Sequence, residues 1–285
     1  MIHFAKVTIL GVGLMGASFA LALKQFRLSS EVVGYGRTAE NLKRAKEKKI
    51  IDSFETDPTE ACRDADLIVL ATPVGIFIET AKRIRPALKK NAIVTDVGSV
   101  KGKLVREMEL LMPEGVFFVG GHPVAGSDRS GIDTAGAGIF RKAKCIITPT
   151  ENTDKEAIGK VVAIWEAFGS RIELMDPYEH DRIYAAVSHL PHLLAYEIVN
   201  TVADIDASYL SFCGSGFMDT TRIASSPPDV WRDICLLNRD NLIEYLELLK
   251  RNLDRVSQYL RAYDSESLEK DFQKARTLRE GIGQN

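Results

Sequence analysis

The first 175 residues alternate apolar segments with amphipathic ones, and no other feature of the chain restricts its fold more strongly. Segments such as KVTILGV, LIVLA and AIVTDVG are read as strands buried on both faces, whereas MGASFALALKQF and VKGKLVREMELL have the spacing of helices. Buried strands separated by helices are typical of a parallel sheet that helices cover on both sides. The pattern predicts an α/β fold with a doubly wound parallel sheet of the Rossmann type.

Strand signals stop near residue 175, and the rest of the chain is predicted to be helical. A long helix is indicated by apolar residues at alternating steps of four and three: Leu242, Leu246, Leu249, Leu253, Val256 and Leu260. This heptad-like seam can be buried inside its own domain or against a second copy, because both satisfy the pattern. We therefore expect a dinucleotide-binding domain over 1–175 and an all-α substrate and dimerisation domain over 176–285.

Composition limits the partners and the location. The chain has 285 residues and a formal net charge of −2, which indicates neither a nucleic-acid nor a membrane partner. No apolar run has the length of a membrane span, and the N-terminus does not have the pattern of a signal peptide. The cysteines lack metal-site spacing and are expected to be free thiols: Cys62, Cys145, Cys213 and Cys235. These features predict a cytoplasmic protein without a metal site.

A glycine-rich motif joins the first predicted strand to the first predicted helix. The sequence LGVGLMGAS has the G-x-G-x-x-G spacing of dinucleotide-binding turns, in the strand-to-helix context that this motif requires. The glycines allow a tight turn and a close approach of the backbone to a pyrophosphate, and the helix N-terminus attracts the phosphates. The expected cofactor contacts here are Gly11, Gly13, Leu14, Met15 and Gly16.

The end of the second predicted strand bears on the choice between NAD and NADP. An acidic residue that bonds the ribose of NAD is expected there, but the sequence has Gly36 followed by Arg37 and Thr38. Arg37 can pair with a 2′-phosphate, which favours NADP or tolerance of both cofactors. Stacking of Arg37 on adenine would suit NAD equally well. Thr72 and Pro73 end another strand, and we expect them to contact the cofactor unless they form an ordinary turn.

Two further strands are followed by candidates for catalysis. The sequence TDVGSVKGK places Asp96, Ser99 and Lys101 after one strand, facing the nicotinamide end of the cofactor. A Gly-rich loop, GGHPVAGSDRSG, is expected to carry His122 at the carboxyl end of a strand over 116–123. A histidine there either satisfies a local turn or accepts a proton as hydride leaves a substrate, with Ser99 orienting the exchange. We favour the catalytic interpretation.

The helical part supplies the remaining candidates. In EHDRIYAAVSHLPH, helical spacing brings Asp181, Ser188 and His192 to nearby faces, although histidines are often satisfied core residues. In GFMDTTRIA, Arg222 can bind a substrate carboxylate or form a structural pair with Asp219.

Taken in order, LGVGLMGAS, LATPV, DVGSVKG, GGHPVAG, SHLPH and DTTRIA closely resemble the prephenate dehydrogenase family, which includes arogenate and cyclohexadienyl dehydrogenases. The resemblance implies oxidative decarboxylation of prephenate to 4-hydroxyphenylpyruvate, with hydride transfer to NAD(P)+, in tyrosine biosynthesis. It implies that His122 takes the hydroxyl proton with Ser99 beside it. Arg222 would bind a substrate carboxylate, oriented by Asp219, and Asp181 would be a second orienting residue. It also places His192 and Ser188 around the substrate and implies a homodimer formed by the C-terminal helices.

The chain departs from the family pattern after GHPVAG, where Ser127 and Asp128 replace a Thr-Glu pair found in many relatives. Both are candidate substrate contacts, and a carboxylate here can accept the ammonium of arogenate or close the pocket. Prephenate, arogenate and dual specificity therefore remain open. A β-hydroxyacid dehydrogenase would favour a lysine early in the second domain, where none is found. A cofactor-binding sensor would not need His122 together with Ser99.

Overall fold

The computed structural model describes residues 2–125 and 131–282, so Ser127 and Asp128 lie outside the described residues. The chain divides into two compact units, Met1–Asn238 and Arg239–Asn285. The first unit contains an eight-stranded sheet followed by helices, and the second unit contains only helices among its described residues. The strands end at Leu174, as the sequence pattern predicts.

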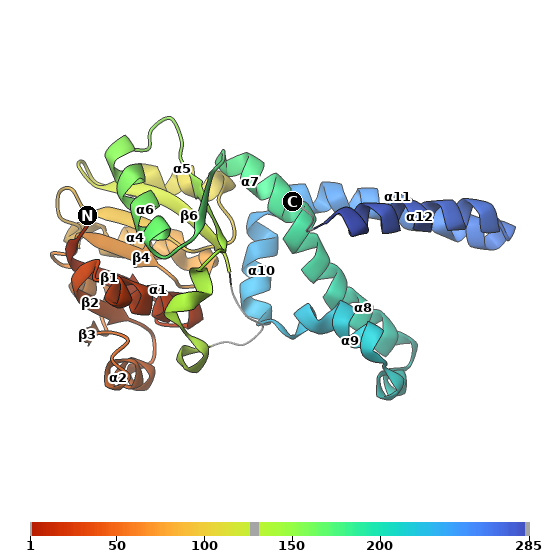
Figure 1. Cartoon of the computed structure of the whole chain (residues 1–285), viewed down its shortest axis with the longest axis horizontal. Coiled ribbons are helices and arrows are strands. Elements are labelled where there is room, and N and C mark those ends of the chain that lie inside the picture. Colours follow the sequence, from red (N-terminus) through yellow and green to blue (C-terminus); the bar gives the residue numbers. More distant parts are fainter. Residues whose placement is uncertain (1, 126–130, 283–285) are drawn as a thin grey trace. The chain divides into compact units, whose positions relative to one another are not determined.

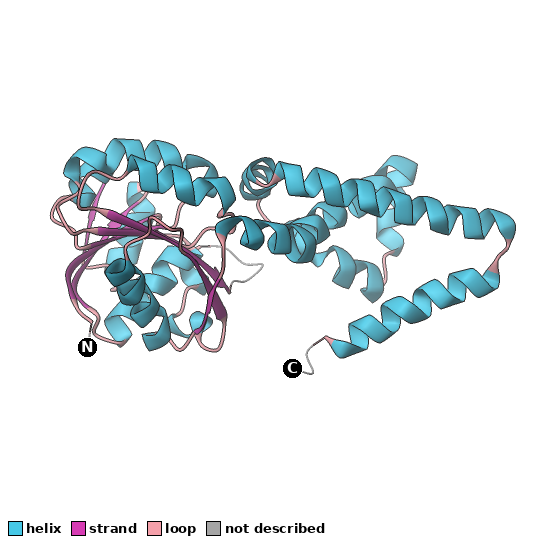
Figure 2. Ribbon diagram, turned by 90° about the horizontal axis from the view of Figure 1, so that it is seen from above, coloured by secondary structure: helices cyan, strands magenta, loops and turns pink. Residues whose placement is uncertain are grey.

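The sheet has the strand order β3-β2-β1-β4-β5-β6-β7-β8, and β1 to β6 are parallel. Its central strands have apolar runs that are buried on both faces, which explains why helices cover both sides (Figure 1, Figure 2). The strands are β1 (Phe4–Leu10), β2 (Ser29–Tyr35), β3 (Ser53–Glu55), β4 (Leu67–Leu70), β5 (Ile93–Asp96), β6 (Phe117–Val124), β7 (Lys144–Thr148) and β8 (Arg171–Leu174).

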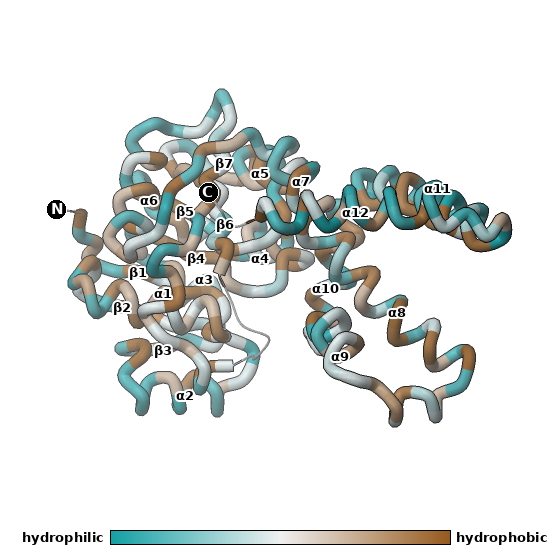
Figure 3. The backbone as a smooth tube through the Cα atoms, turned by 45° about the vertical axis from the view of Figure 1, so that its right-hand side comes forward, coloured by the Kyte–Doolittle hydropathy of each residue, from teal (hydrophilic) through white to brown (hydrophobic). Residues whose placement is uncertain are grey.

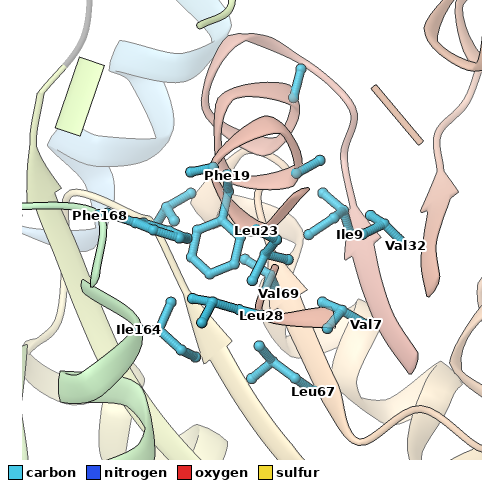
Figure 4. Close-up of a cluster of buried hydrophobic side chains, with 14 of the residues drawn as sticks. Val7, Ile9, Phe19, Leu23, Leu28, Val32, Leu67, Val69, Ile164 and Phe168 are labelled. Atoms are coloured by element: carbon cyan, nitrogen blue, oxygen red, sulfur yellow. The ribbon is translucent and has the colours of Figure 1, made fainter. Parts of the chain in front are cut away.

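Helices form a layer on each face of the sheet. One layer packs Phe19 of α1 against Phe168, which directly follows α6, beside the central strands (Figure 4). Trp165 of α6 packs on the same ring. The other layer packs α3, α4 and α5 on the opposite apolar cluster. The helices that accompany the sheet are α1 (Leu14–Gln25), α2 (Ala39–Glu47), α3 (Pro58–Cys62), α4 (Phe77–Ile84), α5 (Gly102–Leu111) and α6 (Lys155–Ala167).

The sheet is parallel as predicted except at one position, where β7 runs antiparallel to β6. A parallel return needs a crossover connection, usually a helix. The described part of the β6–β7 connection contains only short 3₁₀ turns, Ile132–Thr134 and Ala137–Phe140. The chain therefore returns beside β6 in the opposite direction, and β8 then pairs parallel to β7.

The stretch around His122 belongs to β6 as far as Val124, which confirms the strand predicted over 116–123, and the interpretation of the same residues as a loop is wrong. His122 pairs with Ile146 of β7. A Cβ atom on Gly120 would lie 2.5 Å from the Thr148 hydroxyl oxygen, which is too close. The glycine here reflects close packing within a buried strand, in which the neighbouring element leaves no room for a side chain.

The first unit ends with α7 (Pro177–Tyr184), α8 (Leu190–Asp206), α9 (Ser215–Thr221) and α10 (Pro228–Leu237). A π-helical segment, Ala185–His189, joins α7 to α8. Pro191 follows within the first turn of α8 and has no N–H for the preceding turn, so a locally wider helix fits here. Such widened turns often occur at functional sites, and this one carries Ser188 and His189.

The second unit contains α11 (Arg239–Ala262) and α12 (Ser265–Gly281), which an ion pair between Arg255 and Asp271 connects. The predicted long helix is α11, along which hydrophobic and hydrophilic residues alternate (Figure 3). Leu253 is 56% exposed and Leu260 is 60% exposed, so this part of the seam is uncovered within the single chain. In the described part of the chain, no helix combines the length and apolar character of a membrane span.

Candidate active site

A pocket of about 490 Å³ lies where β1, β2 and β4 end. Its lining includes six of the predicted cofactor contacts: Gly11, Gly13, Arg37, Thr38, Thr72 and Pro73. Leu14 and Met15 form the first turn of α1 instead, and Gly16 is buried beneath that turn. The pocket lies at the carboxyl ends of parallel strands, where doubly wound sheets bind their ligands.

The glycine turn has the close contacts that a dinucleotide site requires. Gly11 adopts a φ of +104°, which strongly favours glycine, and a Cβ on Gly16 would lie 2.0 Å from the Gly11 carbonyl oxygen. Nothing lies within 4 Å of a Cβ on Gly13, so open space faces the N-terminus of α1. The first N–H groups of that helix can bind phosphate there.

A second observation indicates that the pocket accepts a polar ligand. The hydroxyl oxygen of Thr72 is buried and has no hydrogen-bond partner among the described residues. Arg37 is exposed at the pocket lining, whereas Arg83 is held by Asp57 at 2.6 Å. The residues present therefore fit an adenine dinucleotide, whose nicotinamide ring supplies hydride acceptance when bound.

His122 is buried in β6 and is fixed from two sides by residues of α7. Its Nδ1 lies 2.8 Å from Nε2 of His180. The ring of Tyr184 meets His122 edge to face at 4.7 Å and stacks on His180 at 4.5 Å. The imidazole is thus held by a hydrogen bond and an aromatic ring, and its orientation depends on the first helix after the sheet.

His180 is anchored in turn by Asp181. Nδ1 of His180 lies 2.8 Å from Oδ1 of Asp181, and the same oxygen accepts the backbone N–H of Lys101 at 2.8 Å. A Cβ on Gly102 would lie 2.5 Å from Oδ2 of this carboxylate, so a glycine is required for α5 to begin here. The carboxylate therefore connects α7 to the N-terminus of α5.

A buried ion pair between Lys101 and Asp96 lies within the protein near these histidines. Asp96 also accepts the N–H groups of Gly98 at 2.8 Å and Gly121 at 3.0 Å. Lys101 and Asp96 were expected to face the cofactor, but neither is exposed to solvent. Asp96 is the last residue of β5 and Lys101 follows that strand, and together they hold the strand that carries His122.

Burial and neighbouring charges keep the histidines neutral. Desolvation, followed by the proximity of His180, Lys101 and His189, holds the pKa of His122 well below its usual value. Desolvation also lowers the pKa of His180, although the hydrogen bond that His180 donates to Asp181 opposes this shift. His122 is consequently in the neutral form that can accept a proton at pH 7.

His189 and Asn238 extend the network. Nδ1 of His189 lies 3.0 Å from the amide nitrogen of Asn238, which also donates to the Asp181 carbonyl at 2.8 Å. Burial lowers the pKa of His189 to about 4. Nε2 of His189 has no partner with hydrogen-bond geometry among the described residues. The nearby backbone of Ser99 raises the pKa of His189, against the larger effect of burial. This places the backbone of Ser99 next to the histidine network.

The predicted substrate residues lie on the helices that follow. His192 stacks on Trp231 at 3.5 Å and contacts the Ser188 carbonyl oxygen through Nδ1 at 2.9 Å. Arg222 is exposed and lies near enough to His192 to lower its pKa, after the larger effect of burial. Asp219 is exposed on α9.

Sequence reasoning left the roles of His180 and His189 open and did not assign the Lys101–Asp96 pair to the interior. A histidine directly before a predicted orienting carboxylate was the available signal for His180. No local pattern indicates that a lysine five residues after an aspartate is buried with it. These residues come together only because β5, β6 and α7 converge.

Comparison with known proteins agrees with this geometry. The chain matches the family described as "Prephenate dehydrogenase, nucleotide-binding domain" over residues 19–174 and that described as "Prephenate dehydrogenase, dimerization domain" over 176–274. It is 33% identical to the prephenate dehydrogenase of Bacillus subtilis, covering 97% of this chain and 76% of that one. It is 32% identical to the cyclohexadienyl dehydrogenase of Zymomonas mobilis, covering 97% and 95%.

Solved structures give the same result. The prephenate dehydrogenase of A. aeolicus in complex with hydroxyphenyl propionate and NAD+ superposes with a TM-score of 0.91 at 35% identity, covering 98% of both chains. The arogenate dehydrogenase of Synechocystis superposes with a TM-score of 0.79 at 30% identity, covering 96% of this chain and 99% of that one. The chain belongs to the prephenate dehydrogenase family of NAD(P)-dependent oxidoreductases.

Proposed function

We propose that this enzyme oxidises and decarboxylates prephenate to 4-hydroxyphenylpyruvate in tyrosine biosynthesis. The observation that carries the proposal is the neutral, buried His122, which His180 orients. His122 belongs to the same sheet whose strand ends form the dinucleotide pocket. Gly98, which precedes Ser99, packs closely against Val74, which follows the pocket residue Pro73. This contact joins the segment that contains Ser99 to the pocket. The names of the relatives in two organisms support prephenate as the substrate.

The proposed steps follow from the chemistry of the substrate. His122 takes the proton of the ring hydroxyl as the carbon that carries this hydroxyl is oxidised. A dinucleotide held at the glycine turn would accept the hydride from that carbon through its nicotinamide. The electron pair of the bond to the ring carboxylate then enters the ring, CO2 departs, and the phenolic oxygen regains the proton. Ser99 bonds the same hydroxyl and keeps it directed at His122. Aromatisation of the ring makes the sequence effectively irreversible.

Substrate binding is assigned to the helical residues. Arg222 binds a substrate carboxylate as a charge-assisted pair, and Asp219 orients it. His192, stacked on Trp231, and Ser188 line the substrate side. Asp181 orients the catalytic histidine through His180. Ser127 and Asp128 are further proposed contacts, and a carboxylate at position 128 favours acceptance of arogenate as well; a cyclohexadienyl dehydrogenase among the relatives supports this second activity.

We propose NADP as the preferred cofactor, with NAD as the alternative. Gly36 provides no carboxylate to repel a 2′-phosphate, and Arg37 lies exposed in the pocket lining. The substitution Gly36→Asp tests this assignment, because a Cβ at Gly36 meets only the Leu42 side chain at 3.4 Å. The variant is expected to lose NADP affinity and keep or gain NAD affinity. Equal affinities for NADP in both proteins would contradict the assignment.

The domain organisation is proposed as 1–175 for dinucleotide binding and 176–285 for substrate binding and dimerisation. The exposed apolar side chains of α11, together with the similarity of residues 176–274 to a dimerization domain, support a homodimer, which we propose to be cytoplasmic. Neither the pocket nor the net charge of −2 gives a reason to expect a nucleic-acid partner.

The function is tested by mixing the protein with prephenate or arogenate, each with NAD+ or NADP+, and following absorbance of the reduced cofactor. His122→Asn is expected to abolish turnover while leaving cofactor affinity nearly intact. Reduced cofactor from neither substrate would refute the proposed function. Equal loss of turnover and cofactor affinity in the variant would make His122 a structural residue.

A further inference from the structure

We propose that His180 is a positioning residue that, together with Asp181, fixes His122 in the one tautomer whose Nε2 accepts the substrate proton. The inference rests on the proposed function for its catalytic meaning, since that function assigns the base to His122. It goes further because it gives a role to a histidine that need not touch substrate or cofactor.

The direction of each hydrogen bond follows from the carboxylate. An ionised carboxylate only accepts, so Nδ1 of His180 carries the proton in its 2.8 Å contact with Asp181. A neutral imidazole carries one proton, which leaves Nε2 of His180 as an acceptor. Nδ1 of His122, 2.8 Å away, must then donate. The remaining nitrogen of His122, Nε2, therefore holds a lone pair.

The surroundings make this arrangement rigid. Asp181 also accepts the N–H of Lys101 and is confined by Gly102, so it has little freedom to turn away. Tyr184 stacks on His180 at 4.5 Å and meets His122 edge-on at 4.7 Å, which restricts both rings. Such support by neighbouring packing is what holds a catalytic group in its productive geometry.

The charges around the two rings explain why the acceptor is neutral at rest and can still take a proton. Lys101 disfavours a positive charge on both rings, while Asp181 and Asp96 favour one on His180. When Nε2 of His122 takes a proton, its Nδ1–H···Nε2 bond to His180 spreads the new charge toward the Asp181 carboxylate. The groups facing the rings are Asp96 on β5, Lys101 before α5, Cys145 on β7, Asp181 and Tyr184 on α7, and His189 in the π-helical segment, with Glu173 of β8 acting on Tyr184.

Three variants separate positioning from bulk structure. His180→Leu removes the acceptor, whereas His180→Gln can present an amide oxygen to Nδ1 of His122 and is the conservative rescue. Asp181→Asn removes the charge but keeps an oxygen for the N–H of Lys101. His3→Gln is the matched control, because His3 is exposed and bonds only Ser30 and Arg27 among the contacts described.

Kinetics give the first readout. We expect His180→Leu to lower kcat by roughly 10²- to 10³-fold, in the range of general acid–base contributions, with KM and cofactor affinity within about threefold. His180→Gln should stay within roughly tenfold of the parent kcat, since it keeps the acceptor. Asp181→Asn keeps an oxygen that can accept from Nδ1 of His180 and loses only the charge, so it should lower kcat less than His180→Leu does and move the acid limb of kcat/KM to lower pH. Equal changes in kcat, KM and cofactor affinity in His180→Leu would overturn the proposal.

Imidazole ¹⁵N NMR on histidine-labelled protein gives a readout that does not need the substrate. The chain has five histidines, so single substitutions assign the signals. In the parent protein, Nδ1 of both His122 and His180 should be protonated, and His122 should become a mixture of tautomers in His180→Leu. A parent His122 protonated on Nε2 would overturn the proposal even if His180→Leu does not fold. If no substrate is turned over but the tautomers agree, the proposed function fails and the positioning role stands.

Discussion

Removal of the buried positive charge of Lys101 should destabilise the fold far more than removal of a surface charge. Lys101 and Asp96 are both buried, with side chains 0% and 1% exposed. Lys101→Met leaves the Asp96 carboxylate in the interior with the N–H groups of Gly98 and Gly121 as its remaining donors among the described residues. Breaking one partner of a buried pair costs about 3–5 kcal/mol. At about 2–4 °C per kcal/mol for a protein of this size, the melting temperature should fall by roughly 6–20 °C.

The double variant separates the charge from the packing. With Asp96→Asn added, no uncompensated charge remains, and the residual losses are hydrogen bonds of about 1 kcal/mol each. They are the bond from Lys101 to the Val100 carbonyl and one of the two bonds from Gly98 and Gly121, since an amide has one oxygen. Lys144→Met is the control, because its ion pair with Glu173 is exposed on both sides and should contribute about 1 kcal/mol or less. Thermal unfolding followed by near-ultraviolet circular dichroism measures all four proteins. The reasoning is refuted if Lys101→Met melts within 2 °C of Lys144→Met, or if the double variant melts below Lys101→Met.

The remaining predictions concern pH, substrate and cofactor. Because the pKa of His122 is lowered below 6.5, its basic form is lost only at acid pH, and the acid limb of kcat/KM should lie below pH 6.5; a limb above pH 7 would contradict this. Arg222→Ala should raise KM for the substrate about 10- to 100-fold, whereas Arg63→Ala should not change it, as steady-state kinetics will show. Gly16→Ala should lower the melting temperature by several degrees, because its Cβ would lie 2.0 Å from a carbonyl oxygen. Gly13→Ala should leave stability unchanged and weaken dinucleotide binding in a fluorescence titration; loss of stability in both would refute the distinction.

The elements that the sequence predicted are those with local causes. The glycine turn, the apolar strands and the seam of α11 each occupy a short stretch, and their patterns depend on neighbouring residues. The antiparallel placement of β7 could not be predicted in this way, because the chain between β6 and β7 carries no periodic signal for the direction of return. The glycines before Val124 indicated a loop as well as the strand that is found, since strand glycines that leave room for a neighbouring element resemble turn glycines.

The active site was predicted in part, and the missing part depends on contacts between distant residues. His122 was identified because its type and position after an apolar strand are informative without any partner. Its contact with His180 joins residues 58 positions apart and exists only where α7 crosses the end of β6. Lys101 was assigned to the cofactor side because it follows an apolar strand at the edge where parallel sheets bind ligands. A lysine is seldom fully buried, yet here a paired carboxylate permits it.

These buried charges also explain why the site favours the uptake of a proton by His122. At rest, two neutral imidazoles lie near one positive group, Lys101, and two negative ones, Asp96 and Asp181, so the cluster carries one net negative charge. Uptake of a proton by His122 brings the cluster to neutrality in a region from which water is excluded. Fixed charges that complement the charge developing during reaction lower the barrier without reorganisation at that moment. The same three residues bind β5, β6, α5 and α7 together, so the groups that stabilise the fold are the ones that prepare His122 to accept a proton.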